Sequence, residues 1–208
     1  MMEQYETEEQ QVESIIGFWK DNGLALVIGA LLGLGGLLGW RYYNDSQIAA
    51  KEQASFAYEK ASKELVKGEA GFSQAKTFID THSNTGYAML MALEMAQQAI
   101  ERKDLTEAAK QLEFVASNAT LSAVQSVAQL RLARIQIEQG EFDLALASSD
   151  KVTDDAFKSQ SQEIKGDVYL AQQLFDKARA AYSAALETNE RDQVLKMKLD
   201  NLAIAANG

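Results

Sequence analysis

Cysteine and proline are both absent from this 208-residue chain, and histidine occurs once, at position 82. Without cysteine, the chain can form neither disulfide bonds nor thiolate metal sites. Without proline, the commonest breaker of helices is missing. Ala, Gln, Glu, Leu and Lys are abundant and favour helices, so the composition predicts an all-α protein.

Positive charge is scarce, because 20 Lys and Arg residues stand against 30 Asp and Glu residues, which gives a net charge of −10. Residues 1–21 hold six acidic residues and one basic residue, so half of the excess lies in this short stretch. An acidic chain lacks the cations that neutralise nucleic-acid phosphates or grip anionic lipid headgroups. Nucleic acid is therefore not expected as a partner.

Groups that carry catalysis or hold cofactors are few. His82 lies in a polar link, residues 81–86, where we expect an exposed loop histidine. No His, Cys and carboxylate set has metal-ligand spacing. The glycines within residues 33–39 are not followed by Lys and Ser or Thr, so they do not form a phosphate-binding loop. The sequence predicts no catalytic residues, no cofactor, no metal site and no small-molecule substrate.

The sequence has one long hydrophobic run, residues 24–40. It lies within a stretch of 19 uncharged positions between Asp21 and Arg41. As a helix, those positions span about 28 Å, against about 30 Å for the hydrocarbon core of a bilayer. The run has no polar face, unlike a buried core helix, and its acidic start is unlike that of a signal peptide. Aromatic residues flank it, as at membrane interfaces: Trp19, Trp40, Tyr42 and Tyr43. We expect a single transmembrane helix over residues 23–43.

Small residues recur on one face of that predicted helix, at spacings of four, four and three: Ala25, Gly29, Gly33 and Gly36. Small side chains let a second membrane helix approach closely. The alternative is a glycine-rich span without a partner, since glycine is common in membrane helices. The sequence leaves both interpretations open.

A short amphipathic helix is expected before the span, over residues 11–20, with a break at residues 21–23. Its apolar residues recur on one face: Val12, Ile15, Ile16 and Trp19. The helix is either an interfacial lead-in to the membrane or a docking peptide for a partner. The predicted organisation is an acidic tail with this helix (1–22), the transmembrane helix (23–43) and a helical domain (44–208).

Helical periodicity and turn residues divide the rest of the chain into pairs of helices. The segment 68–71 is predicted to be a turn. The expected helices cover residues 47–67, 72–80, 87–101, 105–117, 122–139, 142–151, 162–172, 174–188 and 191–206.

A repeat emerges when the turns are aligned. The residue opening each second helix and the Ala three positions later both recur at spacings of 33, 37 and 33: Phe72, Leu105, Phe142 and Phe175, with Ala75, Ala108, Ala145 and Ala178. A period near 34 residues is the tetratricopeptide signature. Small residues stand twelve positions before three of these alanines: Ala96, Ala133 and Gly166. The last repeat is the best formed, with Gly166, Tyr169, Ala178, Tyr182 and Ala185, and the final helix is expected to cap the stack.

The order of these features resembles the YfgM family, the ancillary subunit of the SecYEG translocon of Gram-negative bacteria. The residues that carry the resemblance extend over essentially the whole chain: Tyr5-Glu6, Gln11-Val12-Glu13, Asp21-Asn22-Gly23, Gly39-Trp40-Arg41-Tyr42, Leu93-Glu94, Ala96-Gln97-Gln98, Leu130-Arg131-Leu132-Ala133-Arg134, Met197-Lys198 and Asn201-Leu202. The resemblance brings no catalytic residues with it.

The resemblance implies a single-pass inner-membrane protein with a cytoplasmic tail and a tetratricopeptide-like domain in the periplasm. It implies partnership with SecYEG and with the periplasmic chaperone PpiD, a role in handing on exported proteins, and a link to the Rcs envelope-stress response. The charge count near the span points the other way. Lys20 and the amino terminus lie on one side, and Arg41, Lys51 and Lys60 on the other, which favours a cytosolic domain. The alternative is therefore a cytosol-facing scaffold that regulates a signalling protein.

Overall fold

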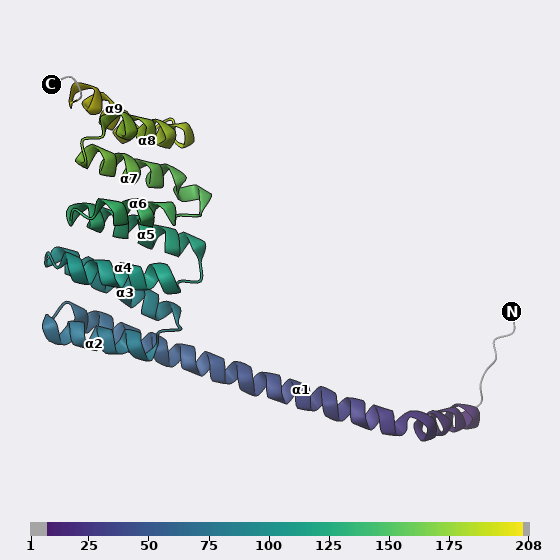
Figure 1. The fold of residues 1–208 in the computed structure, drawn as a ribbon. Coiled ribbons are helices and arrows are strands. Elements are labelled where there is room, and N and C mark those ends of the chain that lie inside the picture. The colour runs from purple at the N-terminus through teal and green to yellow at the C-terminus, as the bar shows by residue number, and fades with distance from the viewer. Residues whose placement is uncertain (1–7, 206–208) are drawn as a thin grey trace, which may run out of the picture. The chain divides into compact units, whose positions relative to one another are not determined.

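The computed structural model describes residues 8–205, and each of the elements within them is a helix (Figure 1). The predicted all-α fold is confirmed. Residues 1–7, which include Tyr5 and Glu6 of the predicted tail, and Ala206 of the predicted last helix lie outside the described residues. The elements are α1 (Glu8–Leu65), α2 (Glu69–Thr81), α3 (Gly86–Glu101), α4 (Leu105–Asn118), α5 (Ser122–Glu138), α6 (Phe142–Asp150), η1 (Asp155–Phe157), α7 (Lys158–Ala171), α8 (Phe175–Thr188) and α9 (Gln193–Ala205).

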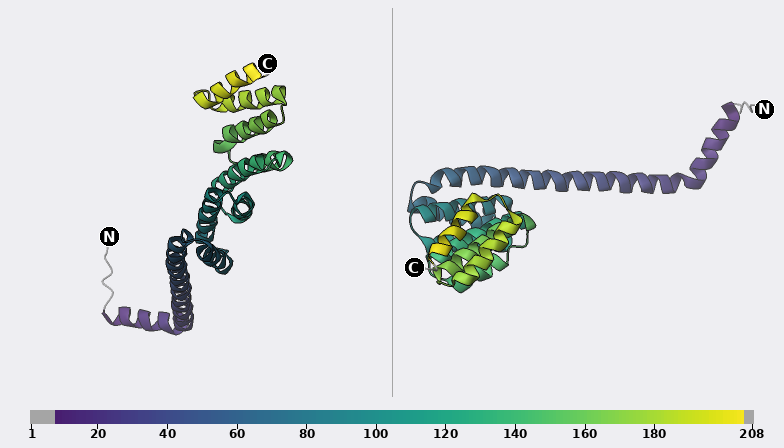
Figure 2. Two further views of the ribbon diagram at one scale, coloured as in Figure 1. Left: turned by 90° about the vertical axis from the view of Figure 1, so that its left-hand side faces the viewer. Right: turned by 90° about the horizontal axis from the view of Figure 1, so that it is seen from above.

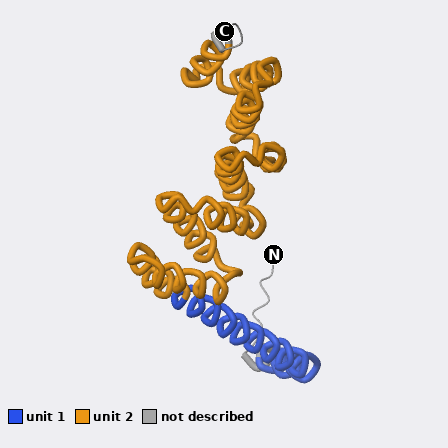
Figure 3. Tube along the Cα trace, turned by 60° about the vertical axis from the view of Figure 1, so that its left-hand side comes forward, with its two compact units in different colours: residues 1–53 blue, residues 54–208 orange. Residues whose placement is uncertain are grey.

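The chain divides into two compact units, residues 1–53 and residues 54–208, here called unit 1 and unit 2 (Figure 3). In unit 1 the apolar side chains of α1 are exposed, for example Leu32 at 72%. By length and composition, α1 can cross a membrane. The boundary between the units follows Gln53, later in the chain than the predicted start of the helical domain at residue 44.

The predicted break at residues 21–23 is wrong, because α1 continues through them. The side-chain amide of Asn22 donates to the carbonyl of Phe18 at 3.3 Å, and a Cβ at Gly23 would contact the Trp19 ring at 3.4 Å. Asn22 is thus accommodated on the helix surface and Gly23 beneath the Trp19 ring, and no proline interrupts the backbone hydrogen bonds. The helix bends near its N-terminal end instead of stopping (Figure 2).

Unit 2 is a stack of helical hairpins, in which three turns share one backbone geometry (Figure 1). Each has a residue of positive φ: Lys103 (63°), Gly140 (76°) and Gln173 (61°). In each, the next residue donates its N–H to a carbonyl five positions earlier at 2.8 Å: Asp104 to Ala99, Glu141 to Gln136 and Leu174 to Tyr169. This is the helix-ending Schellman arrangement. Its recurrence shows that α3/α4, α5/α6 and α7/α8 are copies of one hairpin.

The first turn of unit 2 differs from these three and from its prediction. Residues 68–71 were expected to form the turn, but α1 ends at Leu65 and α2 begins at Glu69. Gly68, with φ of 105°, is the turn residue. Gly71 lies inside α2, where an added Cβ would stand 1.9 Å from the carbonyl oxygen of Glu64. Gly71 therefore allows two helix backbones to touch rather than the chain to turn.

A second boundary also differs, because α7 begins at Lys158 and not at residue 162. The short helix η1 precedes it, and the Asp154 side chain accepts the Ala156 N–H at 3.0 Å at the start of η1. Helical structure therefore begins before residue 162, in residues 155–161, where the sequence shows no apolar periodicity that would predict a helix.

The core of unit 2 consists of three apolar clusters, which share helices α5 and α7. The first cluster is the largest and runs from residue 61 to α5. The second is held by five buried residues of α5, α6 and α7: Leu130, Ala133, Ala145, Ile164 and Val168. The third joins α8 to α9 through residues such as Tyr182 and Leu195.

Buried polar side chains gather around the second cluster. Of the seven within the described residues, six lie on α5, α6 and α7: Ser126, Gln129, Gln136, Ser148, Ser149 and Ser161. We call these six the polar seam. Ser148 donates to the Gln136 side chain and Ser161 to the Ser149 carbonyl, both at 2.8 Å. These two hydrogen bonds supplement the apolar contact of the second cluster, whereas Ser126 Oγ and Gln129 Oε1 are buried without a partner within the described residues.

The end of α1 is joined to α3 by Tyr58. Its hydroxyl donates to the Glu94 carboxylate, and its ring centroid lies 5.5 Å from that of Tyr87 and 6.2 Å from that of Phe78. Burial, together with the hydrogen bond and the charge of Glu94, raises the pKa of Tyr58 from 10.0 to about 12.

Because the pKa of Tyr58 is higher in the folded chain than in the unfolded one, its contribution to stability is complete below pH 10.0 and is lost as pH rises towards 12. We therefore expect urea unfolding to show a steeper loss of stability across this window in the wild type than in Tyr58→Phe. Equal slopes for the two proteins would show that the hydroxyl contributes nothing.

Candidate interaction surfaces

The small-residue face predicted on the membrane helix lies exposed along α1. A Cβ added at Gly29, Gly33 or Gly36 would meet no atom within 4 Å, and the Ala25 side chain is exposed as well. Nothing described in unit 1 packs on this face. It offers a second helix close backbone approach and dispersion contact, but no group capable of chemistry.

The predicted repeat-packing alanines lie in the interior of unit 2. Each is at most 2% exposed, so none is free to touch a ligand: Ala96, Ala108, Ala133, Ala145, Ala178 and Ala185. They belong to three different clusters, so the structure does not bring them together into one site. Their role is to let neighbouring helices pack closely.

Gly166 and Tyr182, by contrast, are brought into direct contact. The Tyr182 ring is fully buried and lies where a Cβ of Gly166 would stand, 2.4 Å from the position of that atom. The third predicted aromatic, Tyr169, is half-buried, with the ammonium of Lys177 5.6 Å from its ring centroid. The missing side chain at position 166 therefore makes room for the ring at position 182.

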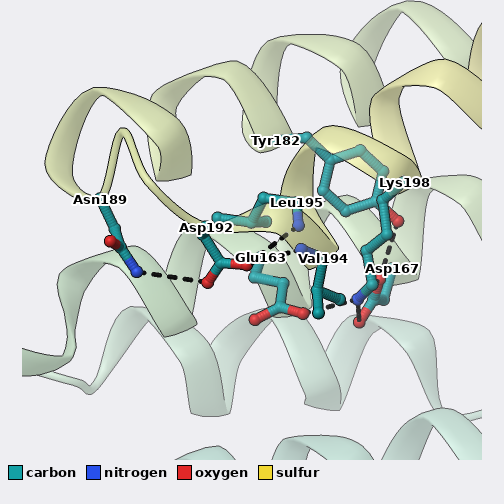
Figure 4. Close-up of polar contacts among 8 residues, drawn as sticks. All are labelled: Glu163, Asp167, Tyr182, Asn189, Asp192, Val194, Leu195 and Lys198. Atoms are coloured by element: carbon teal, nitrogen blue, oxygen red, sulfur yellow. Dashed lines mark hydrogen bonds and ion pairs between the residues drawn. The ribbon is translucent and has the colours of Figure 1, made fainter.

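A polar network surrounds that ring and joins α7, α8 and α9 (Figure 4). The Tyr182 hydroxyl donates to Asp167 Oδ1 at 2.7 Å. Lys198 Nζ donates to Asp167 at 2.6 Å and to Glu163 at 2.7 Å. We call Glu163, Asp167, Tyr182 and Lys198 the cap network, because it fastens α9 to the hairpin beneath it.

Electrostatics in the cap network favour the charged lysine and the neutral tyrosine. Burial alone would lower the pKa of Lys198, but hydrogen bonds from its ammonium to Asp167 and Glu163 raise it above the ordinary value. Burial and the neighbouring carboxylates raise the pKa of Tyr182. Neither group is poised to exchange a proton near neutral pH, so the network holds the fold together and is not an acid–base site.

His82, expected to be an exposed loop residue, is half-buried instead. Its ring centroid lies 4.8 Å from that of Phe78. Its backbone N–H donates to the Phe78 backbone carbonyl at 2.9 Å at the end of α2. Aromatic contact with a buried neighbour accounts for the difference. Within residues 8–205, no three His, Cys, Asp or Glu side chains lie close enough together to hold a metal ion.

Exposed side chains on α3, α5 and α7, the first helices of three hairpins, leave a surface for partners. Leu90 is 47% exposed on α3, and Arg131 and Arg134 are exposed one turn apart on α5. Two acids of these first helices are already engaged, Glu94 by Tyr58 and Asp167 by Lys198. Apolar and guanidinium groups of this kind suit contacts with protein.

Sequence reasoning identified the interior of this stack better than its polar contacts. Glu163, Asp167 and Lys198 were not predicted to act together. A signal was present at Asp167, which directly follows the repeat glycine, Gly166. No periodicity links residue 198 to α7, because residue 198 lies in the capping helix α9, outside the repeats.

The chain matches the family described as tetratricopeptide repeat-like domain over residues 17–204. It is 33% identical, over 98% of its length and 100% of the relative's, to the ancillary SecYEG translocon subunit of Escherichia coli (strain K12). Proteins of that name from Haemophilus influenzae and Neisseria gonorrhoeae are 29% and 31% identical, each over 94% of this chain and 97% of the relative. Among solved structures, the first tetratricopeptide repeat domain of Spaghetti (RPAP3), bound to an HSP90 peptide, aligns with a TM-score of 0.48 and 15% identity over 58% of this chain and 94% of that one.

Proposed function

The chain belongs to the tetratricopeptide repeat-like family of ancillary SecYEG translocon subunits, and on that premise we propose that it is a single-pass inner-membrane protein that assists the translocon through non-catalytic protein contacts. The observation that carries the proposal is the extent of the match. The Escherichia coli relative aligns over 98% of this chain, which takes in both the apolar helix and the repeats. Because the relative aligns with both the apolar helix and the repeats, the match supports the same location for both proteins, at the translocon in the inner membrane.

The apolar part of α1 is the proposed anchor, over residues 23–43, with the tail 1–22 in the cytoplasm and the repeat domain 44–208 in the periplasm. Its leucines are exposed, as they must be in a helix that faces lipid. In the periplasm the repeat stack would act with the chaperone PpiD in handing on newly exported proteins, with a link to the Rcs stress response. The family resemblance is the support for these partners.

The small-residue face of α1 is the proposed contact with another membrane helix, and Gly33 lies at its centre. Replacement of Gly33 by leucine adds apolar area and should leave insertion intact. The larger side chain should separate the two helices, so that co-purification of SecYEG falls severalfold. Leu34→Ala, one position away, is the matched control. Undiminished co-purification in Gly33→Leu would remove this face from the proposal.

The experiment that tests the proposal joins topology to partner capture. Protease added to spheroplasts should digest the repeat domain, and a photo-crosslinker at Arg131 should capture components of the translocon or its chaperones. Crosslinks to lipid alone would contradict the proposal.

A cytosolic scaffold that regulates a signalling protein is the second candidate function. The distribution of basic residues favours it, because Arg41, Lys51 and Lys60 follow the span while only Lys20 and the amino terminus precede it. Long domains are translocated largely regardless of such charges, so this candidate ranks second. Protection of the repeat domain in intact spheroplasts, with digestion only after lysis, would make it the leading one.

A further inference from the structure

A groove lies where the α5–α6 turn faces the end of α7. Its lining residues are Gly140, Glu141, Phe142, Asp143, Leu144 and Gln172. Leu144 is 53% exposed, and Leu174, two residues beyond Gln172, is 41% exposed. We call this groove, together with Leu174, the turn groove. Leu144 thus lines the groove and faces solvent, and the exposed Leu174 follows the lining residue Gln172 in the chain.

The repeat offers a control for Leu144, because equivalent positions are known from the spacings of 37 and 33 residues. The residue at the position of Leu144 is Glu107 in the preceding hairpin and Lys177 in the following one. Glu107 pairs with Lys76 at 3.2 Å, and Lys177 is exposed. The fold therefore does not require leucine at this position.

Leu174 occupies the N-cap of α8, as Leu121 does at α5. Its φ and ψ of −88° and 67° nearly match the −88° and 76° of Asp104, the N-cap of α4. The Asp104 carboxylate accepts the Glu107 N–H at 3.0 Å, whereas Leu174 makes no side-chain cap bond. Leucine is among the poorest N-caps. The fold does not require leucine at this N-cap, and Leu174, unlike Leu121, follows a residue that lines the groove, Gln172, by two positions.

The rim of the turn groove is negatively charged. Glu141 and Asp143 are exposed, and neither forms an ion pair within residues 8–205. The occupant that complements such a surface has apolar side chains for the leucines and ammonium or guanidinium groups for the carboxylates. Anionic lipid and nucleic acid are disfavoured, because the carboxylates repel their phosphates.

We propose that the turn groove docks a segment of a partner protein in which apolar residues alternate with lysine or arginine. Leu144 and Leu174 contact the apolar side chains, while Glu141 and Asp143 hold the cations. The proposal adds a binding surface to the proposed function and does not depend on the translocon assignment, because it rests on unit 2 alone.

The test uses the full chain in phosphatidylcholine nanodiscs and a short fluorescent peptide of alternating leucine and lysine. The wild type should bind the peptide with an affinity that falls as salt is added. Leu174→Asp should weaken binding at least about tenfold and leave the melting temperature unchanged or higher, because aspartate restores the cap. Leu121→Asp is the matched control, since Leu121 is 66% exposed and is also an N-cap without a side-chain bond. It should bind like the wild type.

Charge provides the second arm of the test. Asp143→Lys should weaken binding and flatten its salt dependence, and a peptide with glutamate in place of lysine should not bind. Equal binding by Leu174→Asp and the wild type, or binding to empty nanodiscs alone, would overturn the proposal. So would self-association of the full chain that Leu174→Asp abolishes, because the occupant would then be a second copy.

The two proposals fail separately. Loss of peptide binding in Leu174→Asp with intact crosslinking to SecYEG supports the turn groove as a surface distinct from the membrane contact. Absence of any SecYEG crosslink, with peptide binding intact, would contradict the proposed function and leave the turn groove standing.

Discussion

Replacement of Gly71 by alanine is expected to lower the free energy of unfolding of the first hairpins by about 3 kcal/mol, at the upper end of the cost of overpacking. The new Cβ would stand 1.9 Å from the Glu64 carbonyl oxygen and 2.6 Å from its carbon. These are backbone atoms, so the collision cannot be relieved by a rotamer change and α1 and α2 must separate. Urea unfolding followed by circular dichroism in detergent measures the loss.

Gly86 is the matched control for Gly71. It is also helical, at the start of α3, but a Cβ there meets nothing within 4 Å. Gly86→Ala should be neutral or stabilise the chain by about 0.5 kcal/mol, because alanine has less conformational freedom to lose on folding. If both alanine variants unfold at the same urea concentration, the close approach at Gly71 does not hold in solution.

Replacement of Tyr182 by alanine is expected to cost about 4 kcal/mol, as for other fully buried aromatic side chains. The ring fills the space above Gly166, and its hydroxyl donates to Asp167 at 2.7 Å. Removal of the ring opens a cavity and leaves one carboxylate oxygen of Asp167 without this donor. The measurement is the loss of helical signal on heating or in urea, compared with the wild type.

Phenylalanine at position 182 separates the contribution of ring packing to stability from that of the hydroxyl hydrogen bond. Tyr182→Phe keeps the ring and loses only the hydrogen bond to a charged acceptor, so it should cost about 1.5–3 kcal/mol. Lys198 still neutralises Asp167 at 2.6 Å in this variant. A phenylalanine variant as unstable as the alanine variant would mean that the hydroxyl, and not packing, carries the stability.

The repeat architecture could be predicted because it rests on local, periodic signals. Alanines at spacings of 33, 37 and 33, each three residues after an aromatic or leucine, mark the start of each second helix. Residues 105, 142 and 175 are the first residues of α4, α6 and α8. Of the turns before them, only one contains a glycine. Lys103 and Gln173 adopt the positive φ that Gly140 adopts in its turn.

Glycine marked a turn correctly at Gly68 and Gly140, which have positive φ, but the predictions that treated Gly23 and Gly71 as breakers were wrong, because the role of a glycine depends on tertiary contact. Gly71 was placed in a turn but serves helix packing, and Gly23 lies within α1. A pattern of residue types cannot distinguish a glycine that turns the chain from one that a neighbouring backbone approaches. The same limit hid the cap network, where Lys198 reaches α7 from a helix 31 residues away in sequence.

The family could be identified from short motifs distributed along the whole chain, and the comparisons confirm it. The candidate surfaces could be predicted only in part. The small-residue face of α1 follows from spacing alone, whereas the turn groove depends on exposure at Leu144 and Leu174, which helix periodicity does not report. Comparison with Glu107 and Asp104 in the preceding hairpin gives the only sequence signal that these leucines are unusual.

The polar seam makes unit 2 a chain of neighbours rather than one cooperative block. Within the described residues, its first and third apolar clusters share no residue and are joined through α5, α6 and α7, where buried serines and glutamines lie beside a smaller apolar cluster. In such an array each repeat is stabilised chiefly by its nearest neighbours. We therefore expect damage to the last hairpin to stay local, so that the first hairpins remain folded while α7, α8 and α9 unfold.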